Sequence, residues 1–322
     1  MDKILYLSKK DVEQVDLPMV DIISALERMF LEKGNGRVEM PPKPGIHTQP
    51  DAFIHAMPAY IPAMKSAGIK WVSGYPENQK KKLNYINGLM ILNDAETGIP
   101  LAVMDCTWVT AMRTGAATAL AARYLARKES SSVGILACGV QGRSNLEALR
   151  CEFDLKVVKA YDVYPEVAEK FARDMSKKLD LNIEVVRKPE DAVRKMDMIV
   201  TSGPILKKPT PTIQKGWMEE GAFASPVDFD SYWSGAALAQ ADLLATDDVD
   251  QMEYYRKVGY FKETPKPYAD LGEIVAGKKT GRTSESQRTF AINLGIALED
   301  MATAPMILNR ARELGIGARL DL

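Results

Sequence analysis

The chain has 322 residues, of which 46% are hydrophobic and 26% charged, and its 42 basic and 43 acidic side chains leave a net charge of −1. This length predicts two domains, and the even charge excludes the basic surface that dominates nucleic-acid binding. No segment approaches the roughly 20 apolar residues that cross a bilayer, and the charged start at Met1-Asp2-Lys3 does not match a signal peptide, so we expect a cytoplasmic protein with no membrane partner.

The first 120 residues predict two helices and then a sheet. Ser8 to Asp11 has the spacing of a capping box, and a second helix is expected to begin near Pro18 and to end at Gly34-Asn35-Gly36. Strand-like segments then alternate with turns rich in Pro, Gly and Asn. These segments cover residues 52–57, 67–73, 84–92 and 101–105. A helix from Thr114 to Leu125 is expected to follow.

From about residue 131 the pattern alternates between strand and helix. Strands are expected at 132–137, 156–161, 182–186, 197–202, 221–227 and 242–246, and helices at 143–152, 165–179 and 189–195. Such alternation predicts a doubly wound parallel sheet of the Rossmann type. A long helical region from Ser284 to about Leu314 is expected to end the chain and to pack on the first domain. The predicted domains are therefore 121–301, of α/β type, and 1–120 plus 302–322, a discontinuous α+β domain.

A dinucleotide-binding pattern lies between the first two of these strands. After the apolar run 133–137, the segment Cys138-Gly139-Val140-Gln141-Gly142 predicts a tight turn into a helix whose N-terminus favours a pyrophosphate. Asp162 follows the next apolar run, where a carboxylate accepts the ribose hydroxyls of NAD and repels the 2′-phosphate of NADP. Ala137 stands where the usual pattern has its first glycine, which lowers the specificity of the motif.

The scarcity of histidine and cysteine limits the chemistry. The two histidines, His47 and His55, lie in no metal-binding or nucleophile motif, and the three cysteines form no C-x-x-C pair. We therefore expect no metal site. Acid–base work is expected to fall to lysine and carboxylate side chains.

Several segments, in this order, resemble the ornithine cyclodeaminase/mu-crystallin family, which includes alanine dehydrogenases and ketimine or pyrroline-carboxylate reductases. The similar segments are Met57-Pro58-Ala59-Tyr60, Gly68-Ile69-Lys70-Trp71-Val72, Asp94-x-x-Thr97-Gly98-x-Pro100, residues 110–117, Gly139-Val140-Gln141, residues 271–277 and residues 293–297. The resemblance implies an NAD(H)-dependent enzyme acting on a small amino or imino acid. It also implies a homodimer, formed through the sheet of the first domain, which is then the substrate-binding and dimerisation domain.

Three cations are candidates for holding the carboxylate of such a substrate. The guanidinium of Arg113 suits a carboxylate better than a mobile ammonium does. Lys70 lies inside an apolar run, where burial lowers a lysine pKa and makes the group useful in catalysis. Lys43 is the third candidate, and Phe229 is assigned to the substrate pocket.

Asp228 is the candidate proton carrier, because it ends a predicted strand at the edge where open α/β sheets bind ligands. The resemblance places a catalytic aspartate here. Asp230 lies only two residues away and is kept as the alternative, since the segment 226–230 departs from the family pattern.

The expected contacts with NAD(H) come from loops and strand ends along the chain. They are Tyr85, Arg113, Thr114, Gly139, Val140, Gln141, Asp162, Thr201, Ser202, Ser225, Val227 and Asn293.

Departures from the cyclodeaminase pattern concern the substrate. Where cyclodeaminases have a glutamate, an arginine and a threonine, this chain has His55, Lys43 and Tyr85, and the loss of that glutamate weakens the case for a diamino acid. An amino-acid dehydrogenase or imine reductase is the first hypothesis. An ornithine or lysine cyclodeaminase, which releases ammonia with no net redox change, is the second, and a non-catalytic nucleotide-binding protein resembling mu-crystallin is the third.

Overall fold

The computed structural model describes residues 3–322 and divides the chain into two compact units. Unit 1 consists of Met1–Arg113 and Gly295–Leu322, and unit 2 of Thr114–Leu294. Both boundaries fall seven residues before the expected ones (113 against 120, and 294 against 301). The first boundary lies inside helix α3 (Thr107–Leu125), so a continuous helix connects the two units along the chain.

Unit 1 is built on a seven-stranded sheet in the order β15-β1-β6-β5-β4-β3-β2. Its members are β1 (Lys3–Leu7), β2 (Gly45–Ile46), β3 (Phe53–Ile61), β4 (Ser66–Gly74), β5 (Ile86–Asp94), β6 (Pro100–Asp105) and β15 (Ala318–Asp321). Strands β2 to β6 form an antiparallel meander, and β1 adds in parallel to β6. β15 pairs antiparallel with β1, so segments near residues 3 and 321 lie side by side in one sheet.

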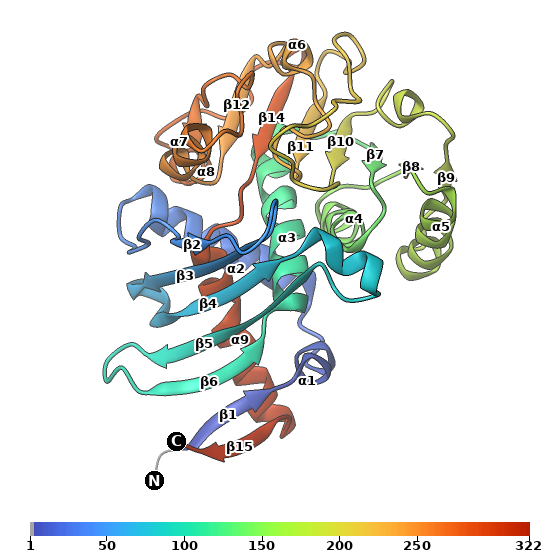
Figure 1. Ribbon diagram of the computed structural model, residues 1–322. Coiled ribbons are helices and arrows are strands. Elements are labelled where there is room, and N and C mark those ends of the chain that lie inside the picture. The colour runs from blue at the N-terminus through green and yellow to red at the C-terminus, as the bar shows by residue number, and fades with distance from the viewer. Residues whose placement is uncertain (1–2) are drawn as a thin grey trace. The chain divides into compact units, whose positions relative to one another are not determined.

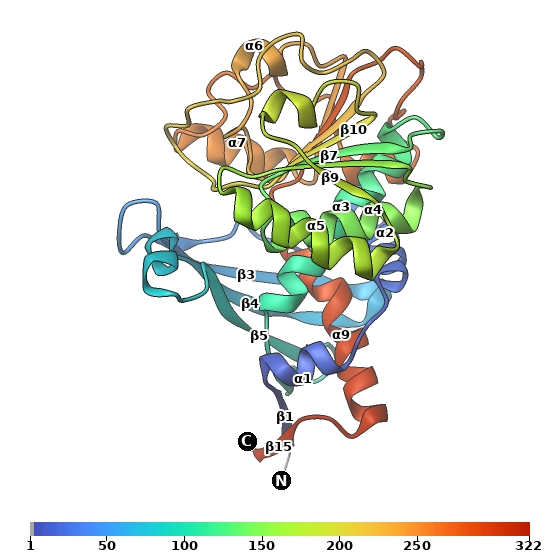
Figure 2. The same ribbon diagram turned by 90° about the vertical axis from the view of Figure 1, so that its right-hand side faces the viewer.

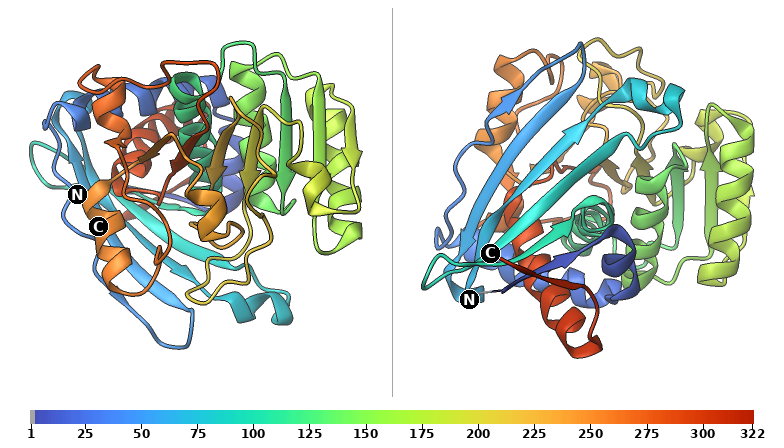
Figure 3. Two further views of the ribbon diagram at one scale, coloured as in Figure 1. Left: turned by 90° about the horizontal axis from the view of Figure 1, so that it is seen from above. Right: turned by 60° about the horizontal axis from the view of Figure 1, so that its bottom comes forward.

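Helices cover one face of this sheet (Figure 1). The helices of the unit are α1 (Lys9–Gln14), α2 (Met19–Gly34) and α9 (Ala297–Leu314), with short 3₁₀ turns η1 (Pro62–Met64) and η2 (Pro76–Lys81). The capping box expected at Ser8 is present, with Ser8 and Asp11 exchanging hydrogen bonds. α9 packs against β3, β4 and β5, and the strands alternate buried and exposed residues as a one-sided sheet requires. Figure 3 shows these strands in front of α9.

Unit 2 is an eight-stranded, fully parallel sheet in the order β13-β12-β14-β11-β10-β7-β8-β9. The strands are β7 (Ser132–Leu136), β8 (Val157–Tyr161), β9 (Ile183–Val185), β10 (Met198–Thr201), β11 (Phe223–Pro226), β12 (Leu243–Thr246), β13 (Ala269–Asp270) and β14 (Thr289–Ile292). The order reverses at β7, where the chain runs to β8 on one side and later returns to β10 on the other. Ligands of open parallel sheets bind at such a switch point.

Helices cover both faces of the parallel sheet, as expected for a doubly wound fold. They are α4 (Val140–Glu152), α5 (Pro165–Leu179), η3 (Pro189–Ala192), α6 (Gly235–Leu238), α7 (Val249–Lys257) and α8 (Leu271–Val275). α4 packs on β7 and β10, and α5 on β8 and β9 (Figure 2). A core of buried apolar residues on the other face joins the strands to α6 and α7.

Three predictions of secondary structure were wrong. The helix expected from Ser284 is absent before residue 297, because 289–292 form β14, which lies fully buried between β11 and β12. The periodicity of a short apolar run does not distinguish a buried strand from a helix. Here the pairing with the parallel strands β11 and β12 makes it a strand. The helix expected at 189–195 is only the 3₁₀ turn η3. α3 begins at Thr107 rather than Thr114, because the Asp105 carboxylate accepts the Thr107 amide (2.8 Å) and stabilises an earlier start.

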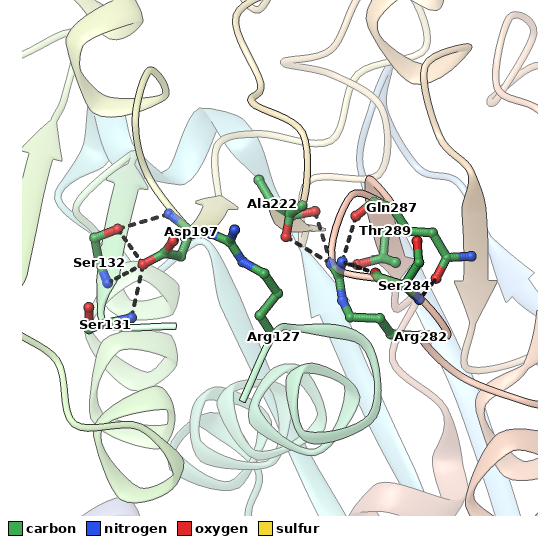
Figure 4. Close-up of polar contacts among 10 residues, drawn as sticks. Arg127, Ser131, Ser132, Asp197, Ala222, Arg282, Ser284, Gln287 and Thr289 are labelled. Atoms are coloured by element: carbon green, nitrogen blue, oxygen red, sulfur yellow. Dashed lines mark hydrogen bonds and ion pairs between the residues drawn. The ribbon is translucent and has the colours of Figure 1, made fainter. Parts of the chain in front are cut away.

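Two arginines cross-link the amino-terminal edge of the unit 2 sheet (Figure 4). Arg127 pairs with Asp197, whose carboxylate also accepts the backbone amides of Ser131 (2.9 Å) and Ser132 (3.0 Å). Arg282 donates to the carbonyl oxygens of Leu125, Ser284, Gln287, Gly221 and Ala222 and to the hydroxyl of Thr289. These contacts tie the amino ends of β7, β10, β11 and β14 together.

Among the described residues, no helix combines the length and the apolar character needed to cross a membrane.

Candidate active site

The predicted dinucleotide loop lies at the carboxyl end of β7, at the switch point of unit 2. Gly139 is the N-cap of α4, and no heavy atom lies within 4 Å of where its Cβ would be, so the helix N-terminus is open. Val140 beside it is 67% exposed. A Cβ on Gly142 would lie 2.6 Å from the Ala137 carbonyl oxygen, so only glycine permits the close approach of α4 to β7. Both features match the demands of a pyrophosphate-binding turn.

Ala137 replaces the first glycine of the pattern at a strained position. Its φ of 71° lies in the left-handed region that glycine adopts freely and alanine does not. The Ser202 hydroxyl donates to its carbonyl oxygen (2.8 Å) and helps to fix this conformation. The backbone at Ala137 therefore has the left-handed conformation that glycine adopts at this position of the pattern.

Asp162 follows β8 beside this loop. One of its carboxylate oxygens accepts the Cys138 amide (2.8 Å) and the other the Tyr164 amide (3.0 Å). These bonds hold the carboxylate in place, and each oxygen retains a lone pair for a hydroxyl donor.

The other predicted cofactor residues of unit 2 lie on strands of the sheet, directly after a strand, or in α3. Asn293 follows β14, and both polar atoms of its side chain are buried with no hydrogen-bond partner among the described residues. Thr201 and Ser225 are fully buried, and the Ser225 hydroxyl lies 3.0 Å from that of Thr118. Thr114, at the start of the unit, is 8% exposed. Buried polar atoms without a partner are costly, so the Asn293 amide is a candidate contact for a ligand.

Asp228, two residues after β11, is fully buried. Thr201 donates its hydroxyl to Oδ1 of Asp228 (2.5 Å) and accepts the indole N–H of Trp233 (3.1 Å). Oδ2 has no hydrogen-bond partner among the described residues. Burial raises the pKa of Asp228 to about 7, against the opposing effect of the Thr201 hydrogen bond. A carboxyl group with a pKa near neutrality can both accept and donate a proton.

Asp230 and Phe229 occupy different surroundings. Asp230 accepts a hydrogen bond from the Thr264 hydroxyl (3.0 Å), and burial raises its pKa. Phe229 has a φ of 63° and is 4% exposed, with its ring packed on Phe261 (4.9 Å between centroids) and Tyr255 (5.1 Å). The Phe229 ring therefore belongs to the core of unit 2, which argues against its assignment to the substrate pocket.

Unit 1 contains the three predicted cations, and two of them are buried. Lys70 on β4 is 1% exposed, and its Nζ lies 2.6 Å from Oδ2 of Asp300. Arg113, 6% exposed, lies in the second turn of α3 rather than at the helix start, so neighbouring amides are engaged within the helix. Its Nη1 lies 2.6 Å from Oε2 of Glu299. Lys43 is half-buried and donates to the Gly295 carbonyl (3.2 Å).

His55 on β3 is a neutral ring. Burial, with smaller effects from Lys43, His47 and Lys70, lowers its pKa to about 3. The Phe53 ring stacks on it at 4.3 Å. Tyr85, the remaining predicted residue, precedes β5, and its carbonyl accepts the Tyr75 amide (3.0 Å).

Comparison with known proteins identifies the group to which these features belong. The model of the ornithine cyclodeaminase/mu-crystallin family matches residues 3–315. The chain belongs to this family. The expected family, the α/β fold and the parallel Rossmann-type sheet are thus confirmed.

Relatives in this family share the full length of the chain. The alanine dehydrogenase of Archaeoglobus fulgidus is 35% identical over 98% of both chains, and the nodulation efficiency protein NfeD of Rhizobium meliloti 33% identical over 97% of both. Among solved structures, the Thermococcus litoralis Δ¹-pyrroline-2-carboxylate reductase with NADH and L-proline is 35% identical, with a TM-score of 0.90 over 98% of this chain and 100% of that one. An archaeal alanine dehydrogenase dimer with bound NAD is 34% identical, with a TM-score of 0.89 over the whole of both chains.

Sequence reasoning missed the two acids that contact the predicted cations of unit 1. Glu299 and Asp300 lie in the first turn of α9 and are fully buried. Two adjacent acids inside the otherwise apolar run 294–302 were the available signal. Among the described residues, no group of three or more His, Cys, Asp or Glu side chains is arranged to hold a metal ion.

Proposed function

We propose that this chain is an NAD(H)-dependent enzyme that moves a hydride between the nicotinamide and the α-carbon of a small L-amino acid or cyclic imino acid. Its full-length similarity to an alanine dehydrogenase and to a pyrroline-2-carboxylate reductase, each at 35% identity, carries the proposal. In this proposal unit 2 binds the cofactor and unit 1 the substrate.

The residues of unit 2 fit NAD(H). The open N-terminus of α4 at Gly139 receives the pyrophosphate, the Asp162 carboxylate accepts the adenosine ribose hydroxyls, and the unsatisfied amide of Asn293 gains a partner. When bound, the nicotinamide supplies or takes up the hydrogen and two electrons. Ser202, Val227, Gln141 and Tyr85 remain predicted contacts.

The cations of unit 1 are suited to bind the carboxylate of the substrate. Lys70 and Arg113 are withdrawn from water, which strengthens their attraction for a carboxylate. Lys43, half-buried, adds a third positive charge.

Asp228 completes the proton balance. Oxidation of an amino acid removes a hydride from the α-carbon and a proton from the α-nitrogen, and an imino acid results. Asp228 accepts that proton through Oδ2 and returns it in the reverse reaction, to which its pKa of about 7 is suited in both directions. Water then releases a keto acid and ammonia from an open-chain imine, whereas a cyclic imino acid persists.

One experiment separates the candidate activities. The purified protein is incubated with NAD and L-alanine, L-proline, L-ornithine or L-lysine, while NADH absorbance and ammonia are followed together. We expect NADH to accumulate with a small amino acid, and the reverse assay with pyrroline-2-carboxylate or with pyruvate and ammonia to consume it. Ammonia released from a diamino acid at constant NADH identifies a cyclodeaminase instead. NADH binding without turnover in any assay leaves a non-catalytic binding protein.

The neutral His55 favours the dehydrogenase or reductase over the cyclodeaminase. An acid at this position would hold the distal amine of a diamino acid, and an imidazole with a pKa of about 3 carries no charge at neutral pH. The neutral His55 ring is better matched to a substrate with an uncharged side chain.

A homodimer in the cytoplasm belongs to the same proposal. The sheet face of unit 1 opposite α9 exposes a row of apolar side chains on paired strands: Trp71 (50% exposed), Leu89 (43%) and Ile91 (37%). Such patches on a sheet mark protein interfaces. Light scattering is expected to give twice the chain mass, and Trp71→Arg to give a monomer, whereas Tyr254→Arg, an exposed aromatic of α7, leaves the mass unchanged. A monomeric wild-type protein contradicts the proposal.

A further inference from the structure

Two fully buried carboxylates, Glu299 and Asp300, lie in unit 1 against the cations proposed to bind substrate. A buried charge is costly unless it is paired, and removal of one partner leaves the other uncompensated. Both acids belong to the first turn of α9, so one helix end supplies both negative charges.

The two acids make different contacts. Glu299 Oε2 lies 2.6 Å from Nη1 of Arg113. Asp300 is shared, with Oδ2 at 2.6 Å from Nζ of Lys70 and Oδ1 at 3.3 Å from Nε of Arg113. Asp300 thus bridges Lys70 and Arg113, whereas Glu299 forms an ion pair with Arg113.

Gly295 brings the third cation to the same cluster. Its φ is 75°, and a Cβ there would lie 2.5 Å from Nη1 of Arg113, so the backbone passes directly beside the guanidinium. The carbonyl of Gly295 accepts the Lys43 ammonium. Three cations (Lys43, Lys70, Arg113) and two anions (Glu299, Asp300) leave one positive charge, which a single carboxylate neutralises.

The two buried cations differ in one chemical respect. A guanidinium keeps its proton throughout the accessible pH range, whereas a buried ammonium loses it readily. Burial and the nearby Arg113 lower the pKa of Lys70, and Asp300 opposes them. The other ionisable groups that interact with Lys70 are the neutral His55 of β3 and the Cys106 thiol before α3, whose pKa is raised to about 11. β5 presents Met90 opposite Lys70.

We infer that Asp300 is a positioning residue that keeps the Lys70 ammonium charged and aimed for a substrate carboxylate, while Glu299 orients Arg113. This inference rests on the proposed function for the identity of the ligand. Loss of Asp300 and loss of Glu299 should therefore differ in their effect, because Lys70, which pairs with Asp300, can lose its charge, whereas Arg113 cannot.

The test compares Asp300→Asn with Glu299→Gln over about pH 6 to 10, with the amino acid that the wild-type enzyme turns over. For Asp300→Asn we expect KM to rise about tenfold per pH unit above the lowered pKa of Lys70, with a smaller change in kcat. At low pH, where Lys70 is protonated, KM is expected to level off above the wild-type value, because the ammonium is no longer positioned. For Glu299→Gln we expect KM to rise by a factor of about ten at every pH. Asp197→Asn, which cuts the Arg127 ion pair of unit 2, is the matched control and leaves the pH dependence of KM unchanged.

A second measurement needs no turnover. In Asp300→Asn the folded state holds Lys70 with a pKa further below its unfolded value, so the unfolded chain binds more protons and stability rises with pH. The stability deficit of this variant in denaturant unfolding is therefore expected to shrink as pH rises towards 10, and that of Asp197→Asn is not. If the wild type turns over no amino or imino acid but the deficit shrinks, the proposed function fails and the charge pairing stands. Parallel KM profiles for Asp300→Asn and the wild type, or a deficit independent of pH, overturn the inference.

Discussion

The two units control ionisation in opposite ways. In unit 1, Lys70 and Arg113 are buried against two carboxylates, and the Asp300 carboxylate opposes the fall in the pKa of Lys70 that burial causes. In unit 2, Asp228 is equally buried, but its carboxylate pairs with the Thr201 hydroxyl instead of a cation, and burial raises its pKa to about 7. Burial alone therefore does not determine the charge of a group. The neighbours decide whether it serves as a fixed electrostatic contact or as a proton carrier.

The largest effect is expected from replacing Asp228, the proposed proton carrier of unit 2. Asp228→Asn is expected to lower kcat by a factor of about 10² to 10⁴, because general acid–base catalysis is lost, while NADH binding, followed by fluorescence, persists. Asp230→Asn, two residues away and bonded to Thr264, serves as the matched variant and is expected to affect kcat far less. Equal losses in the two variants would contradict the assignment to Asp228.

The proposed pyrophosphate-binding turn of unit 2, which is formed by backbone amides, is tested at Gly139. A Cβ at this residue meets no protein atom within 4 Å, so Gly139→Ala is expected to leave the melting temperature almost unchanged. The added methyl group would occupy the space proposed for the pyrophosphate, and we expect the Kd for NADH to rise about tenfold or more. Unchanged NADH affinity in calorimetry would remove this loop from the cofactor site.

The sensitivity of Asp228 to its uncharged neighbours is tested by Thr201→Val. The Thr201 hydroxyl stabilises the ionised form of Asp228, so its loss is expected to raise the pKa of Asp228 further above 7. The pH profile of kcat/KM in the oxidative direction, which needs the carboxylate, should shift upward by about one unit. Thr264→Val, at the neighbouring acid, is the control, and an identical shift there would indicate a general effect of lost hydroxyls.

The smallest effect is expected at Ala137. Because its φ of 71° suits glycine, Ala137→Gly should stabilise the protein by about 1 kcal/mol, in contrast to the usual cost of glycine. Ala148→Gly, within α4, is expected to lower stability by a similar amount. Denaturant unfolding measures both, and a destabilising Ala137→Gly would show that the strain at this residue is small.

The sequence predicted the parts of this molecule that depend on local pattern. The strand, turn and helix around Gly139 follow from adjacent residues, and so does the position of Asp162. β14 was mistaken for helix because the run Thr289–Ile292 is an interior strand only by virtue of its distant partners β11 and β12. The partners of Glu299 and Asp300 could not be predicted for the same reason, since their cations lie 186 and 230 positions earlier in the chain (299 against 113, and 300 against 70).

The strand order also has a consequence for biosynthesis. β14 is inserted between β11 and β12, and α9 and β15 complete the sheet unit that begins at residue 3. A nascent chain leaving the ribosome therefore holds two unfinished sheets until residues 289–321 emerge. Neither unit can close during most of translation, so chains truncated before residue 289 should expose unpaired strand edges and become clients of chaperones or proteases.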